Sequence, residues 1–141
     1  MMEIQNYSKT IRRCMTTLYI LRGVPGSGKS TLAKLISQSL GCPHYEADMF
    51  FIDKDGNYNW SADKLHLAHK WCFEKTQKAL ESGSDCIVSN TFVKQRDLKR
   101  YKKMAEEVGA TPYVVVVQND FGNIHSVPPE VVQRMRDEFE Y

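Results

Sequence analysis

The stretch Gly23-Val24-Pro25-Gly26-Ser27-Gly28-Lys29-Ser30-Thr31 decides the fold of this 141-residue chain. Its glycines permit backbone conformations and a close approach that larger side chains would block. The N–H groups of such a loop can turn inward around a phosphate, at the start of a helix whose dipole favours anions. Lys29 adds a point positive charge, and Ser30 adds a hydroxyl that can bind a cation. The stretch therefore predicts a site for nucleotide phosphates.

The segments on both sides agree with this interpretation. Leu18-Tyr19-Ile20-Leu21 is a short apolar run that predicts a buried strand, and apolar residues recur at helical spacing from Lys29 to Leu40. Gly-x-x-x-x-Gly-Lys-Ser between a strand and a helix matches the Walker A motif in full. We therefore expect ATP as the cofactor, with GTP as the alternative, and Mg²⁺ at the Ser30 hydroxyl.

Strands alternate with helices along the rest of the chain. Each expected strand is almost continuously apolar, which favours a parallel sheet covered by helices on both faces. We expect an α/β chain with the three-layer P-loop NTPase fold, in which a small, mostly parallel sheet is flanked by helices. The further strands are expected at 44–47, 85–90 and 113–117, and the further helices at 61–80, 94–108 and 127–141.

Size and composition are those of one globular domain, with 42% hydrophobic residues, 26% charged residues and a net charge of +2. The domain is expected at 17–141, after a polar extension at 1–16. No apolar run approaches the roughly 20 residues that span a membrane, and the extension lacks the apolar stretch of a signal peptide. We expect a cytoplasmic protein that does not bind membranes. The oligomeric state is not specified by the sequence.

Metal-binding patterns are weak outside the Walker A stretch. The four cysteines form no Cys-x-x-Cys pair, so reduced and mostly buried thiols are expected. His66 and His69 lie three apart on an expected helix, where a surface or packing role is the commoner one. The segment 53–57 has acidic residues like a calcium loop but lacks the closing Glu, so it predicts a turn.

A carboxylate candidate for catalysis stands at Asp48. Phosphoryl transfer requires a group that positions or deprotonates the acceptor hydroxyl, and cations that hold charge in the transition state. Asp48 follows the second expected strand, at the edge where ligands bind in open α/β sheets. A loop-capping role is the alternative for this side chain.

Several more segments match one branch of the P-loop kinases. They are Glu46-Ala47-Asp48-Met49-Phe50-Phe51, Asp55-Gly56-Asn57-Tyr58, Ala68-His69-Lys70-Trp71-Cys72, Asn90-Thr91 and Asn123-Ile124-His125-Ser126-Val127-Pro128. With the Walker A stretch, these segments resemble the polynucleotide-kinase-like, AAA-type ATPase-like family, which includes the kinase domain of bacteriophage polynucleotide kinase. The resemblance runs from about Thr17 to Tyr141.

The resemblance implies transfer of the γ-phosphate of ATP to a polynucleotide 5′-hydroxyl, at a DNA or RNA end. Asp48 then corresponds to the base that activates this hydroxyl. Lys29, Ser30 and Thr31 keep phosphate and metal roles, and Asn90 and Thr91 stand beside the active site.

Three departures from the family pattern bear on activity. Ser89 replaces an aspartate before Asn-Thr, and Phe51 replaces the arginine that contacts the acceptor phosphate. The lid before Val127-Pro128 lacks its arginine, a residue whose role can be worth several orders of magnitude in rate. Arg134 or Arg136, from the following helix, are the candidates to substitute.

Two other functions therefore stay open. The aromatics Phe50, Tyr58 and Trp60 would suit a kinase for a small acceptor such as a nucleoside. The bare lid would suit a nucleotide-binding regulatory module with weak catalysis. A basic stripe along the helix at 94–108 is compatible with nucleic-acid binding, although a solvated helix face is the commoner explanation. Its members are Arg96, Lys99, Arg100 and Lys103.

Overall fold

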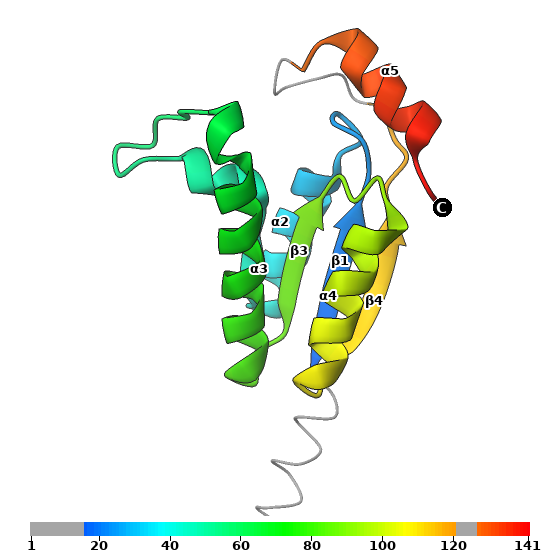
Figure 1. The fold of residues 1–141 in the computed structure, drawn as a ribbon. Helices are drawn as coiled ribbons and strands as arrows, with labels where there is room; N and C mark the ends of the chain where they lie inside the picture. Colours follow the sequence, from blue (N-terminus) through cyan, green and yellow to red (C-terminus); the bar gives the residue numbers. More distant parts are fainter. Residues whose placement is uncertain (1–15, 121–126) are drawn as a thin grey trace, which may run out of the picture.

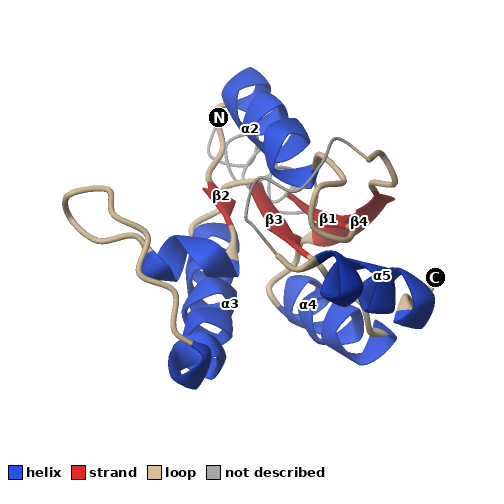
Figure 2. Cartoon of the chain, turned by 90° about the horizontal axis from the view of Figure 1, so that it is seen from above, coloured by secondary structure: helices blue, strands red, loops and turns tan. Residues whose placement is uncertain are grey.

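The sheet has four parallel strands in the order β2-β3-β1-β4 (Figures 1 and 2). The structure is a computed structural model, and it describes residues 16–120 and 127–141. This order sets β1, which leads into the Walker A stretch, between two neighbours. The strands are β1 (Thr17–Arg22), β2 (His44–Tyr45), β3 (Cys86–Asn90) and β4 (Thr111–Val116).

Helices cover both faces of this sheet, as Figure 2 shows from above. Helix α2 lies on one face, and helices α3 and α4 lie on the other. Helix α5 lies over the carboxyl ends of the strands (Figure 1). The helices are α2 (Lys29–Leu40), α3 (Leu65–Glu81), α4 (Gln95–Glu107) and α5 (Pro129–Glu138), with short 3₁₀ helices η1 (Ala47–Phe51) and η2 (Ala62–Lys64).

The two core layers follow the alternation of side chains along β1. Leu18 and Ile20 are fully buried against α3 and α4. Leu21 points to the other face, where it packs in one cluster with Ala33 of α2. Because successive residues of a strand face opposite sides, one apolar strand supplies both layers. The expected three-layer P-loop NTPase fold is confirmed.

Two expected strands differ from the structure. The second strand was expected at 44–47 but ends at Tyr45, because the Ala47 N–H donates to Asn90 Oδ1 (2.9 Å) and the chain turns into η1. The last strand was expected to be buried on both faces, yet β4 is the edge of the sheet and Tyr113 is 60% exposed. Sequence patterns report apolar character, whereas strand order sets burial.

Helix α3 also begins later than expected. Ser61 makes no side-chain cap, and a turn of η2 precedes α3, which starts at Leu65. At the N-terminus, Thr16 is 4% exposed and its carbonyl accepts the Thr111 N–H (2.8 Å). Thr16 thus belongs to the folded unit. The rest of the expected extension and the lid residues at 123–126 lie outside the described residues. Within 16–120 and 127–141, each helix is too short or too polar to cross a membrane.

Arg22 ties the end of β1 to the C-terminal segment. Its guanidinium is 1% exposed and donates to the Phe92 carbonyl from Nε (3.1 Å) and from one terminal nitrogen (2.6 Å). The same nitrogen donates to the Glu140 carbonyl (2.6 Å), and the group stacks on the Phe139 ring at 4.3 Å. Three segments that are far apart in sequence therefore meet directly beside the Walker A stretch.

We expect Arg22→Met to lower the free energy of unfolding by about 2 to 4 kcal/mol, because bonds from a charged donor contribute about 1.5 to 3 kcal/mol. The variant would also leave the buried Phe92 carbonyl without the Arg22 donors, whereas the Glu140 carbonyl keeps Gln95 Nε2 as a donor (3.0 Å). Chemical denaturation measures the change. Arg96→Met is the matched control, since the side chain of Arg96 is 87% exposed. Equal denaturant midpoints for Arg22→Met and Arg96→Met would contradict the role of Arg22 in stabilising the fold.

Candidate functional site

The Walker A stretch forms a loop whose backbone opens toward the start of α2. Gly26 and Gly28 have φ values of 84° and 91°, in the left-handed region that favours glycine. Gly28 is the N-cap of α2 and supplies no side-chain cap to the helix. The N–H groups of the first turn are therefore left for a ligand, and the helix dipole favours an anion there. The loop has the backbone form that the sequence predicts for phosphate binding.

Gly23 is required for a different reason, which is close packing. A Cβ at this position would lie 2.5 Å from the Val117 carbonyl oxygen and 2.6 Å from Ser27 Oγ. The Gly23 N–H also donates to the Thr91 carbonyl (3.2 Å). The loop is thereby fixed between the ends of β3 and β4, with no room for a side chain.

Gly23→Ala is expected to destabilise the domain by about 1 to 3 kcal/mol, because the backbone of β4 cannot move away cheaply. The affinity for ADP should fall in parallel, since the loop itself must shift. Gly83→Ala serves as the control. It adds strain at a φ of +87° but meets open space far from the loop. If Gly23→Ala bound ADP as tightly as Gly83→Ala does, the packing argument would be wrong.

Lys29 lies in this loop with 9% of its surface exposed. Burial lowers the pKa of its ammonium, while the charges of Glu46 and Asp48 act to raise it. Two carboxylates from the segment after β2 therefore lie close to the P-loop cation. A buried ammonium in such surroundings is suited to binding phosphate oxygens.

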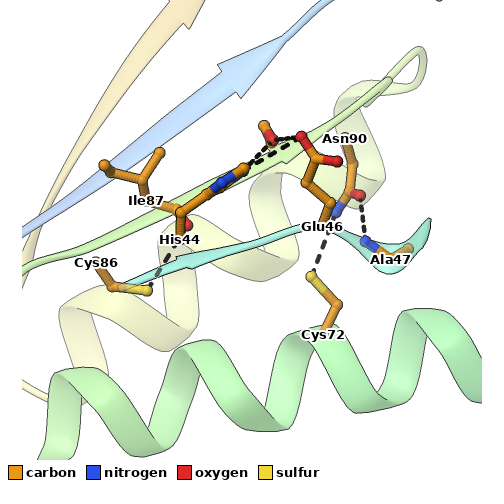
Figure 3. A network of polar contacts seen from close by, with 8 residues as sticks. His44, Glu46, Ala47, Cys72, Cys86, Ile87 and Asn90 are labelled. Atoms are coloured by element: carbon orange, nitrogen blue, oxygen red, sulfur yellow. Dashed lines mark hydrogen bonds and ion pairs between the residues drawn. The ribbon is translucent and has the colours of Figure 1, made fainter. Parts of the chain in front are cut away.

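Glu46 is the site residue that the sequence analysis missed. Its Oε1 accepts a hydrogen bond from Ser89 Oγ (2.6 Å) and lies 3.3 Å from His44 Nε2. Figure 3 shows these contacts at one carboxylate oxygen of Glu46. Burial raises the pKa of Glu46, but hydrogen bonds from His44, Ser30 and Ser89 outweigh burial and lower the pKa to about 2. The carboxylate is held ionised against the P-loop hydroxyl.

Asp48 is half-buried on η1, at the carboxyl edge of the sheet. The Tyr58 hydroxyl donates to its Oδ1 (3.2 Å). Burial and the Asp48 charge raise the pKa of Tyr58 to about 12, so this hydroxyl stays a donor at neutral pH. Asp48 also interacts with His69 of α3, whose pKa burial lowers. The carboxylate stands between the P-loop and the start of α3.

The other candidate residues divide into two groups. Asn90 and Thr91 lie at the site but are already engaged. Asn90 Oδ1 accepts the Ala47 N–H, and Asn90 Nδ2 donates to Cys72 Sγ (3.6 Å), as Figure 3 shows. The Thr91 carbonyl accepts the Gly23 N–H. They position the loop and η1.

Phe51 and Arg134 are not brought to the site. Phe51 is 4% exposed in the core, where its ring lies 6.2 Å from that of Tyr58. Arg134 is exposed on α5, whereas Arg136 lines a cavity of about 220 Å³ together with Gly23 and the end of β4. Arg136 pairs with Asp120 at 3.4 Å. Arg136, unlike Arg134, thus lies beside the first residue of the Walker A stretch.

The α4 stripe is partly neutralised. Arg96 and Lys103 lie within 4.0 Å of Asp97 and Glu107, and Arg100 stacks on the Phe73 ring at 4.2 Å. These contacts are those of a solvated helix face. The described cysteines, Cys42, Cys72 and Cys86, are buried free thiols, as expected.

A Mg²⁺ ion fits the oxygen groups of the site. The Ser30 hydroxyl donates to a carboxylate, which leaves its lone pairs for a cation, and Mg²⁺ takes oxygen ligands with help from substrate phosphates. Among the described residues, no three His, Cys, Asp or Glu side chains gather as a separate metal site.

Two curated relatives match most of the chain. An uncharacterised protein of Pasteurella multocida is 29% identical over 134 residues, which are 86% of this chain and 75% of that protein. Human NEDD4-binding protein 2 is 28% identical over 138 residues, which are 87% of this chain but only 8% of that protein. The human relative is thus far longer than this domain.

Solved structures share the fold at low identity. A gluconokinase from Sinorhizobium meliloti has a TM-score of 0.63 at 18% identity, covering 90% of this chain and 77% of that one. Kti12 of Chaetomium thermophilum, in complex with ADP-AlF₃, has a TM-score of 0.65 at 12% identity, covering 88% and 80%. A chain of the Pnkp1/Rnl/Hen1 RNA repair complex has a TM-score of 0.62 at 22% identity, covering 88% and 37%.

The family is shown by a match along most of the chain. Residues 18–140 match the family described as an AAA domain, which is most of the chain. The Walker A loop, the parallel sheet and the likeness to kinase structures agree with that assignment. The chain belongs to this AAA-domain family and has its P-loop, kinase-like nucleotide-binding fold.

Proposed function

We propose that this domain is a kinase that transfers the γ-phosphate of ATP to a hydroxyl acceptor, a polynucleotide 5′ end. The observation that carries the proposal is that the end of β3 holds both segments, since the Gly23 N–H donates to the Thr91 carbonyl (3.2 Å) and the Ala47 N–H donates to Asn90 Oδ1 (2.9 Å). Lys29 of the loop and Asp48 of η1 are thereby brought to one edge of the sheet, where their charges interact. A phosphate-binding cation and a carboxylate base within one site are the parts that phosphoryl transfer needs.

In the proposed reaction, the acceptor oxygen attacks the γ-phosphorus of ATP, the bond to the β–γ bridging oxygen breaks, and ADP leaves. Asp48 takes the proton of the attacking hydroxyl, with Tyr58 holding the carboxylate in place. Lys29 holds its ammonium against the phosphate oxygens, beside the backbone N–H groups of the loop. When bound, Mg²⁺ neutralises charge on the β- and γ-phosphates.

Exposed aromatic side chains next to Asp48 favour an acceptor that carries bases. Tyr58 is 49% exposed and Trp60 is 54% exposed, on the loop that joins η1 to η2. Ile52 and Tyr58 pair across the base of this loop, which holds it in one shape. Aromatic faces of this kind bind bases by stacking, at about 1 to 3 kcal/mol per base. The relation to a chain of an RNA repair complex supports the same acceptor class.

A kinase for a small alcohol is the second candidate. Phe51 stands where a contact to the acceptor phosphate was expected, and its ring is buried in the core. An acceptor without a phosphate would not need that contact, and the gluconokinase shares the fold.

The experiment that tests the proposal is transfer of labelled γ-phosphate from ATP to matched acceptors. We expect labelling of a 5′-hydroxyl oligonucleotide and none of the same oligonucleotide with a 5′-phosphate. Nucleosides and sugar alcohols are assayed in parallel by ADP release. Transfer to a small alcohol alone would show that this alcohol, and not a polynucleotide 5′ end, is the acceptor. Tight ATP binding without any transfer would favour a regulatory module.

A further inference from the structure

A P-loop hydroxyl that binds Mg²⁺ normally has a carboxylate beside it, which another strand supplies. In this chain, β3 is one of the two strands that pair with β1, and Leu21 lies opposite Ser89 in the parallel register. Ser89, 1% exposed, carries no charge at the position where the family pattern has an aspartate. Taken alone, β3 leaves the P-loop hydroxyl without its expected carboxylate.

The structure brings a carboxylate to the same place from the next strand along. Glu46 follows β2, which pairs with the opposite edge of β3. Its Oε1 lies 2.6 Å from Ser89 Oγ, and it hydrogen bonds to the Ser30 hydroxyl. Glu46 therefore bridges the residue that replaces the aspartate and the residue that would bind the metal. The side chain of Glu46 is 14% exposed, so the bridge is largely shielded from water.

We infer that Glu46 replaces the missing β3 aspartate as the carboxylate partner of the Mg²⁺-binding hydroxyl. In this arrangement, Glu46 is a positioning residue for Ser30, the residue that would hold the metal ion. The role rests on the proposed function in that both need an ATP-Mg²⁺ complex at the P-loop. It names the one carboxylate on which that complex depends.

The hydrogen-bond donors around Glu46 fix its orientation. Ser89 has a single hydroxyl proton and gives it to Glu46, so its oxygen must accept from His44 Nε2, which lies 2.7 Å away. His44 therefore carries its proton on Nε2. The hydrogen bonds that run from His44 through Ser89 to Glu46 hold the carboxylate from the side of the sheet (Figure 3). Ser30 donates to the same carboxylate from the loop.

Without a metal ion, the contacts of Glu46 would be the same whether it only stabilises the fold or also supports Mg²⁺ binding. The test must therefore separate a structural role from a role in Mg²⁺ binding. The measured quantities are the affinity for ADP without metal and the affinity for Mg²⁺ at saturating ADP, both by calorimetry. Glu46→Gln keeps the shape of the side chain and removes its charge. We expect Mg²⁺ affinity to fall about 10- to 100-fold, as for other outer-shell partners of a metal, while metal-free ADP affinity stays within about twofold.

The decisive variant is the exchange Glu46→Ser with Ser89→Asp, which returns the carboxylate to β3. We expect this double variant to recover most of the lost Mg²⁺ affinity. Glu74→Gln, on the exposed side of α3, is the matched control and should change neither affinity.

Unchanged Mg²⁺ affinity in Glu46→Gln would overturn the inference. So would an exchange variant that binds metal-free ADP normally but regains no Mg²⁺ affinity. If the exchange variant fails to bind metal-free ADP, the Mg²⁺ affinity of Glu46→Gln alone decides whether the inference holds. Because neither measurement contains an acceptor, the inference can hold even if no acceptor is phosphorylated, and it can fail while phosphoryl transfer is observed.

Discussion

Asp48→Asn is expected to lower kcat for phosphoryl transfer by about 10²- to 10⁴-fold, the usual contribution of a general base. The amide keeps the shape of the side chain and can still pair with the Tyr58 hydroxyl, but it cannot accept the proton of the attacking hydroxyl. Single-turnover transfer to the acceptor measures the change. The affinity for ADP with Mg²⁺ should stay within about twofold, because the phosphates are held by other groups.

Asp63→Asn is the matched control for this result. Asp63 is an exposed carboxylate on η2, away from the P-loop, and its loss should leave kcat unchanged. A kcat for Asp48→Asn equal to that of Asp63→Asn would show that Asp48 only caps its loop. Asp48 would then not be the general base, although the proposed nucleotide binding at the P-loop would be unaffected.

Lys29→Met is expected to reduce kcat/KM by about 10²- to 10³-fold or more, the cost of losing one preorganised positive group at the transferring phosphate. Methionine fills a similar volume, so the buried position of Lys29 is kept while its charge is removed. The stabilisation of the fold by ADP, read as the rise in Tm with ligand, should shrink because affinity for the phosphates falls.

Lys34→Met separates this effect from a general loss of positive charge. Lys34 is exposed on the same helix, and its removal should change neither kcat/KM nor the ADP-induced rise in Tm. If Lys29→Met and Lys34→Met behaved alike, the loop would not be holding the phosphates.

The parts of the fold that sequence predicted correctly are those with local patterns. The Walker A stretch needs certain residues at fixed spacing, and the strand before it and helix after it carry their own periodicity. These local rules gave β1 and α2 nearly to the residue. Asp48 was placed at the correct edge because it comes shortly after the end of β2.

The rest depends on contacts between segments that are far apart in sequence. The burial of β4 could not be predicted, because it is set by the strand order that makes β4 an edge. Arg22 was missed, since its partners lie 70 and 118 residues away. One signal for Glu46 was present in the sequence: an extra carboxylate lies two residues before Asp48, while Ser89 replaces the aspartate of the family pattern. The sequence does not show that these two positions are in contact, because that contact depends on the strand order of the sheet.

The central claim is that the P-loop and Asp48 meet at one acceptor, and a structure tests this most directly. The experiment is a crystal structure of the full chain with ADP, Mg²⁺ and a 5′-hydroxyl oligonucleotide. The account predicts the β-phosphate in the loop around Gly26 and Lys29, and the acceptor hydroxyl within about 2.6 to 3.2 Å of the Asp48 carboxylate. An oligonucleotide 5′ end bound away from Asp48, with ADP correctly seated in the loop, would contradict it.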